Sequence, residues 1–84
     1  MEYPVPKWCG KPVLFNQHAT EEALNKNIPV DKILLTLEEG METKEERKEG
    51  VLELVKGFKK EMLKVVVADC GDNWRVVTIM RFRR

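Results

Sequence analysis

The feature that most constrains the fold is a change of hydrophobic period after residue 50. Three runs rich in Val, Ile, Leu and aromatic residues follow, separated by short turn-forming segments, and they cover residues 51–58, 62–70 and 74–83. Consecutive strands with short connections predict an antiparallel meander. Residues 63–68 are apolar on both alternating faces apart from Lys64, so we expect a central strand covered on both sides for part of its length.

Two short helices are predicted in the first half of the chain. Residues 16–27 form the first, with Asn16 or Thr20 as the capping residue. The second spans residues 28–37 and ends at Gly40. Its apolar residues follow the i, i+3, i+4, i+7 spacing of one helical face, and they are Val30, Ile33, Leu34 and Leu37.

The remaining segments complete an α+β prediction. Residues 1–12 contain three prolines and are expected to form an extended N-terminal arm. Residues 13–15 are a candidate edge strand. Residues 41–50 are expected to be a solvated loop or a charged edge strand, and the alternative is a dedicated acidic docking segment. The chain has 84 residues, which suits one domain. Residues 13–84 are therefore predicted to pack two short N-terminal helices on a three- to four-stranded antiparallel sheet.

The distribution of charge limits the classes of partner. The chain carries 15 Lys and Arg against 14 Asp and Glu, which excludes a globally basic nucleic-acid binder. Residues 1–50 hold 7 bases and 10 acids, whereas residues 51–84 hold 8 bases and 4 acids. This distribution is compatible with a local basic face in residues 51–84. It is equally compatible with a simple electrostatic attraction between the two halves of the chain. Glu38 and Glu39 on the second predicted helix argue against sequence-specific DNA reading.

The sequence lacks the signatures of membrane-spanning proteins and of metal-binding proteins. No apolar run reaches the roughly 18 residues of a membrane span, so we expect no membrane partner and a cytoplasmic location. Cys9 and Cys70 lie far apart without a Cys-x-x-Cys spacing, and there is one histidine. These residues are too few for a persuasive metal site, so no metal or cofactor is expected. Whether the two cysteines pair is left open.

Basic residues and one histidine are the candidates for chemistry. His18, at the start of the first predicted helix, suits either acid–base catalysis or a structural hydrogen bond. Arg75, Arg81 and Arg83 share a parity along the last strand, which predicts that they point to one face. The alternative for these arginines is ion pairing with acids such as Asp69 at the strand ends. The candidate catalytic residues are His18, Arg75 and Arg81, and the candidate RNA-binding residues are Lys64, Arg83, Lys59 and Lys60.

A family resemblance enters through residues 15–28 and two strand motifs. The stretch FNQHATEEALNKNI resembles the opening of a bacterial and archaeal family of unknown function, with its His-Ala helix start and a bend before the second helix. Residues 63–67 and 75–79 match that family's Arg-Val-Val-Val and Val-x-Thr-Val runs. The resemblance covers about residues 13–82. Where relatives carry two helix arginines, this chain has Glu22 and Lys26, and the acid inverts the local charge.

The resemblance implies a toxin-like function. The family is similar in layout to the RelE/ParE-like toxins, several of which cleave RNA with basic and polar side chains on the sheet. It therefore implies RNA or ribosome binding, a metal-independent endoribonuclease activity, or pairing with a small antitoxin-like protein. The alternative is a non-enzymatic interaction module, a homodimer or a partner-binding domain, that uses the arm, an edge strand and Trp8.

Overall fold

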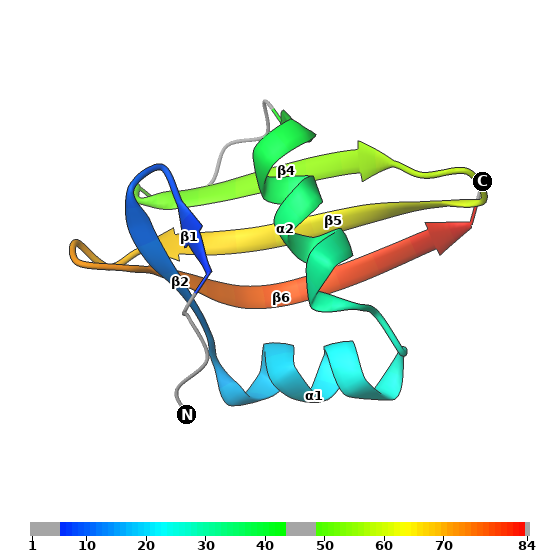
Figure 1. The fold of residues 1–84 in the computed structure, drawn as a ribbon, viewed down its shortest axis with the longest axis horizontal. Coiled ribbons are helices and arrows are strands. Elements are labelled where there is room, and N and C mark those ends of the chain that lie inside the picture. The colour runs from blue at the N-terminus through cyan, green and yellow to red at the C-terminus, as the bar shows by residue number, and fades with distance from the viewer. Residues whose placement is uncertain (1–5, 44–48, 84) are drawn as a thin grey trace.

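The computed structural model describes residues 6–43 and 49–83, which build one mixed sheet with two helices (Figure 1). The sheet order is β1-β2-β6-β5-β4-β3. Helix α2 lies across β4 and β5, and α1 runs alongside β6 (Figure 1). The strands are β1 (Lys7–Trp8), β2 (Lys11–Phe15), β3 (Met41–Glu42), β4 (Val51–Gly57), β5 (Glu61–Asp69) and β6 (Trp74–Arg83).

The predicted meander is present, but the predicted three- to four-stranded antiparallel sheet is wrong. Strand β2 pairs parallel with β6, with Val13 opposite Trp74 and Phe15 opposite Val76. The short strands β1 and β3 extend the two edges. The fold is therefore α+β with a six-stranded mixed sheet. The parallel pair joins segments about sixty residues apart, and such long-range pairing leaves no local pattern in the sequence.

The helix ends follow the predicted chemistry. Helix α1 spans Gln17–Asn25, and the Asn16 side chain accepts a 2.7 Å hydrogen bond from the Ala19 N–H. Helix α2 spans Val30–Glu39 and ends at Gly40. A Cβ at Gly40 would lie 2.3 Å from the Thr36 carbonyl oxygen, so only glycine fits this close approach.

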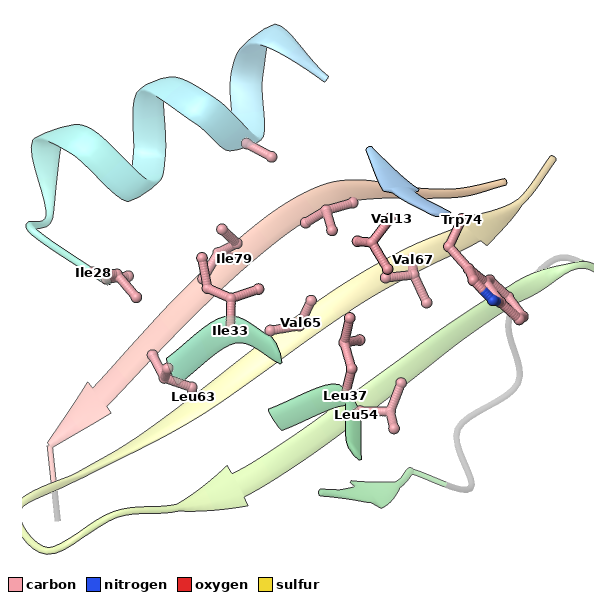
Figure 2. Close-up of a cluster of buried hydrophobic side chains, with 12 residues drawn as sticks. Val13, Ile28, Ile33, Leu37, Leu54, Leu63, Val65, Val67, Trp74 and Ile79 are labelled. Carbon is pink, nitrogen blue, oxygen red and sulfur yellow. The ribbon is translucent and has the colours of Figure 1, made fainter. Parts of the chain in front are cut away.

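The core lies between α2, α1 and one face of the sheet (Figure 2). Ile33 and Leu37 of α2 are buried over Val65 and Val67 of β5. Val30, placed by its spacing on the same helical face, is instead 48% exposed, because it lies in the first turn of α2. The buried side chains of this cluster are Val13, Ala19, Ile28, Ile33, Leu37, Leu54, Leu63, Val65, Val67, Trp74, Val76 and Ile79.

A β-bulge in β6 changes which side chains share a face. Val67 lies opposite Val76, whereas Val66 lies opposite Thr78, so Val77 is an extra residue in the strand. Val76 before the bulge and Ile79 after it are both fully buried on the helix side. The bulge therefore reverses the odd–even alternation along β6.

The segments predicted as an arm and as a charged loop contribute short strands. Within the predicted arm of residues 1–12, β1 and the start of β2 form a hairpin, and residues 1–5 lie outside the described residues. Within residues 41–50, β3 pairs with β4, and residues 44–48 lie outside the described residues.

Candidate functional site

Basic side chains gather where the β4–β5 turn meets the end of β6. Gly57 ends β4, and the Phe58 N–H donates a 2.7 Å hydrogen bond to the Glu61 carbonyl, which closes the turn. Strand pairing then sets Glu61 opposite Arg83. The result is an open pocket of about 590 Å³, which we call the basic pocket, lined by Lys59, Lys60, Glu61, Arg81 and Arg83.

Among the described residues, Glu61 is the one acid that lines the basic pocket, and two cations already engage it. Lys32 of α2 donates to Glu61 Oε1 at 2.7 Å, and Arg81 Nε lies 2.7 Å from Oε2. The hydrogen bond from Lys32 lowers the Glu61 pKa most, and the positive charges of Arg81 and Lys32 add to this against the cost of desolvation. Glu61 is therefore ionised at neutral pH, and Lys59, Lys60 and Arg83 leave the pocket with excess positive charge.

The pocket also orients one of its arginines. Arg81 donates through Nη1 to the Lys26 carbonyl oxygen at 2.7 Å, in addition to its contact with Glu61. The last turn of α1 and the start of β5 therefore hold this guanidinium from two sides. Lys32 in turn lies 5.1 Å from the centre of the Phe58 ring. The pocket is thus an arrangement of cations on fixed elements, with Lys59 and Lys60 exposed at its turn.

The bulge separates the three arginines that were predicted to share a face. Arg75 lies opposite Ala68, on the sheet face away from the core, near the start of β6. Arg81 lies opposite Leu63, whose side chain is fully buried on the helix side. Paired residues of an antiparallel sheet share a face, so Arg75 and Arg81 point to opposite sides. The parity prediction is wrong for Arg75, since it assumed an uninterrupted alternation.

Lys64 is also outside the pocket. It lies on the sheet face away from the core, and its Nζ is 3.0 Å from Glu53 Oε1. The Glu53 side chain is fully buried, so this ion pair accounts for a lysine inside an apolar strand. Of the residues predicted to bind RNA, the structure therefore brings together Lys59, Lys60 and Arg83, but not Lys64.

His18 belongs to a separate polar cluster on α1. Its Nε2 lies 2.5 Å from Glu22 Oε1, and Lys26 donates to Glu22 Oε2 at 2.7 Å. The Thr78 hydroxyl donates a 2.8 Å hydrogen bond to Glu22. Hydrogen bonds from Lys26 and Thr78 lower the Glu22 pKa. Glu22 therefore links α1 to β6.

The three candidate catalytic residues, His18, Arg75 and Arg81, do not lie together in the structure. His18 precedes Lys26, whose carbonyl holds Arg81, by eight residues along α1, which corresponds to about 12 Å of helix. Arg75 lies on the other face of the sheet. Two residues of the site, Glu61 and Lys32, are not among those predicted from the sequence. Glu61 beside two lysines in a turn was the available signal, whereas the reach of Lys32 from α2 depends on tertiary packing.

The described residues also give three negative findings. Within residues 6–43 and 49–83, no group of three or more His, Cys, Asp or Glu side chains has a geometry suited to a metal ion. Both cysteines in this part of the chain, Cys9 and Cys70, are free and exposed. Neither described helix is long and apolar enough to cross a membrane.

The fold and the pocket together define a small α+β domain with a local polycationic site. Residues 15–81 match the family described as "Domain of unknown function (DUF4258)", and the chain belongs to that family. This confirms the expected membership in a family of unknown function. No curated protein and no solved structure matches the chain.

Proposed function

We propose that the domain binds RNA through the basic pocket. The observation that carries the proposal is the convergence of Lys59, Lys60, Arg81 and Arg83 around one acid that is already paired. A phosphate group entering the pocket would meet lysine and arginine donors, and guanidinium forks suit phosphate oxygens. Binding would release the counterions of each neutralised phosphate, so the affinity would fall as salt rises.

The choice of RNA among polyanions follows the sequence resemblance to RelE/ParE-like toxins, which no match to a solved structure supports. The near-zero net charge of the chain disfavours indiscriminate polyanion binding, whereas a local pocket can still hold one stretch of backbone. Cleavage of RNA without a metal needs a base at the 2′-hydroxyl and cations at the phosphate. The pocket supplies the cations, and His18 lies about 12 Å along α1 from the residue that holds Arg81. The proposal is therefore binding, with cleavage measured in the same samples.

The test compares two double variants that each remove two positive charges. The pocket variant, Lys60→Ala with Arg83→Ala, removes two positive charges from the basic pocket. The control variant, Lys7→Ala with Arg75→Ala, removes two exposed positive charges from the opposite end of the sheet. Fluorescence anisotropy with an unstructured labelled RNA measures affinity between 50 and 200 mM salt. We expect the pocket variant to lose about tenfold at low salt, with the salt slope reduced by about 1.4.

The control variant should bind as the wild type does. Equal losses in the two variants would show a diffuse charge effect and contradict a local pocket. Wild-type protein that fails to bind RNA at 50 mM salt would end the proposal. Gel analysis of the RNA recovered from each sample shows whether cleavage accompanies binding.

A second candidate function is self-association, and an exposed apolar patch favours it. Leu24 is 75% exposed and Val30 is 48% exposed at the junction of α1 and α2. They border an apolar pocket of about 230 Å³, lined by Phe15, Thr20, Ala23, Leu24, Ile28 and Val30. In a two-fold dimer the same patch meets itself, so Leu24 of each copy would face the pocket of the other. Trp8, the residue first expected at an interface, instead packs on Trp74.

Light scattering at several protein concentrations tests this candidate. A dimer that dissociates on dilution, and that Leu24→Lys abolishes, would support it. A strict monomer up to high concentration would exclude it.

A further inference from the structure

Phe82 is placed unlike the other aromatic residues of the sheet. It lies between Arg81 and Arg83 in sequence, and successive strand residues point to opposite faces, so its ring projects from the sheet face opposite the basic pocket. The ring is 45% exposed. The other described aromatic side chains are buried or half-buried, and they are Trp8, Phe15, Phe58 and Trp74.

A cation accompanies the exposed ring. Lys64 Nζ lies 5.5 Å from the centre of the Phe82 ring. The same ammonium is ion-paired with the buried Glu53, which fixes its position over one face of the ring, so a base would stack on the other face. An exposed aromatic ring with a neighbouring cation is the arrangement on which proteins stack unpaired nucleobases. Lys64, which lies outside the pocket, thus occupies a second position where a nucleic acid could be recognised.

The edge of β6 connects this ring to the pocket. Strand β2 pairs with β6 only along Trp74–Val76, so in the described part of the chain no strand lies on that side of Phe82. Lys26, at the end of α1, contacts β6 at Ile79 and Arg81, so a chain would cross this edge beyond Arg81, beside Phe82, to reach both faces of the sheet. Arg81 and Arg83 would meet its phosphates on one side, and Phe82 would meet a base on the other.

We propose that Phe82, together with Lys64, forms a stacking subsite for an unpaired nucleobase of the RNA whose phosphates occupy the basic pocket. The subsite rests on the proposed RNA binding and narrows its substrate class to single-stranded RNA. A base in a duplex is already stacked and paired, so it is not available to the ring. Every base has an aromatic face, so the subsite tolerates different sequences.

The test changes the ring while keeping its bulk. Phe82→Leu retains an apolar side chain without a π-face, Phe82→Tyr retains the ring, and Met80→Leu is the matched control on the same sheet face. Three probes are compared by anisotropy or competition: an unstructured ten-nucleotide RNA, a duplex RNA of equal length, and inorganic polyphosphate. The melting temperature of each variant confirms that it is folded.

The expected pattern is selective. Phe82→Leu should weaken binding of the single-stranded RNA about 5- to 150-fold, the range measured for one lost base–aromatic stack. Its affinity for polyphosphate should not change, and Phe82→Tyr and Met80→Leu should bind both probes as the wild type does. The wild type should prefer the single strand to the duplex.

Each other result has a distinct meaning. If Phe82→Leu binds single-stranded RNA like the wild type while the Lys60 and Arg83 double variant is weakened, the subsite is wrong and the proposed function stands. If Phe82→Leu loses polyphosphate affinity in equal measure, the ring supports the pocket rather than a base, and the subsite is again wrong. If the wild type binds neither RNA nor polyphosphate, both proposals fail.

Discussion

The two ends of β6 differ in how their charges are matched. At the end formed by Trp8, Lys11, Asp69 and Trp74, which we call the tryptophan end, Lys11 pairs with Asp69 at 2.6 Å and lies 4.2 Å from the centre of the Trp74 ring. The Trp74 indole N–H donates to the Trp8 carbonyl oxygen at 3.1 Å. At the other end, the described residues that line the basic pocket are four cations and one acid, Glu61. We expect the matched charges over packed rings to serve stability, and we propose that the unmatched charges serve binding.

The largest expected effect is the loss of stability when the tryptophan end is opened. Trp74 is 8% exposed and its ring centre lies 4.8 Å from that of Trp8. Trp74→Ala should therefore lower the free energy of unfolding by about 3–5 kcal/mol. Chemical denaturation followed by circular dichroism measures this change. Arg83→Ala, at the basic pocket, is the matched variant and should stay within about 0.5 kcal/mol of the wild type.

If Trp74→Ala does not fold, Trp74→Phe keeps most of the buried surface and removes the indole donor. At temperatures where the variant is folded, its RNA affinity should equal that of the wild type. A parallel loss of RNA affinity would show that the two ends are coupled, and the contrast between them would not hold.

The next effect concerns the acid of the basic pocket. Glu61→Gln removes the negative charge and leaves one carbonyl oxygen in place of the two carboxylate oxygens that Lys32 and Arg81 contact separately. We expect RNA affinity to rise about 2- to 5-fold at low salt, the size of one screened charge–charge interaction near a surface. The gain should vanish at high salt in the same anisotropy measurement. A lower affinity would mean that Glu61 acts mainly by orienting Arg81.

A smaller difference is expected between two lysine substitutions. Lys11→Met removes a cation from the face of the Trp74 ring, a contact worth about 0.5–1 kcal/mol of stability. Lys60→Met should leave stability within about 0.5 kcal/mol, since the described residues give Lys60 no ion-pair partner. Urea denaturation of both variants compares them. If both variants lose the same free energy of unfolding, the contacts of Lys11 add no more stability than the exposed position of Lys60 does.

The smallest effect is the dependence of stability on pH. The hydrogen bond from Lys11 lowers the Asp69 pKa most, followed by the Gly71 N–H, against a usual value of 3.8. A folded-state pKa below the unfolded one adds stability above the unfolded value, and this stability is lost as pH falls through the folded value. The melting temperature of the wild type should therefore fall more steeply below about pH 4 than that of Asp69→Asn.

The same measurement can be made on Glu61, at the other end of the strand. Its pKa is also lowered, from a usual value of 4.5, so Glu61→Gln should likewise flatten the acid side of the profile. An acid-side profile of Asp69→Asn identical to that of the wild type would show that the Lys11 pair adds no stability.

Local pattern predicted most of the elements and failed where distant segments meet. The three strands of the meander and the Asn16 cap are present because alternation and capping act within a few residues. The parallel β2–β6 pair brings Val13 to Trp74, and a three-residue apolar run does not specify a partner. The six-stranded mixed sheet could therefore not be derived from the sequence.

The candidate site was predicted in part for a related reason. Lys59, Lys60, Arg81 and Arg83 meet at one pocket as basic residues of the sheet half. Because of the bulge at Val77, Arg75 lies on the sheet face opposite to that of Arg81 and Arg83. The bulge falls within a run of β-branched residues, and no glycine marks its position in the sequence. The contribution of Lys32 to Glu61 depends on how α2 crosses the sheet, which no local spacing encodes.

The pairing of β2 with β6 also determines when the sheet can form during translation. The ribosome releases the chain from its N-terminus, so Val13 is exposed to solvent well before Trp74 has been made. Closure of such a long loop comes late, after the helices and the β4–β5 hairpin have had time to form. Arg81 and Arg83 come later still, so the nascent chain carries no complete basic pocket until residue 83 has left the ribosome.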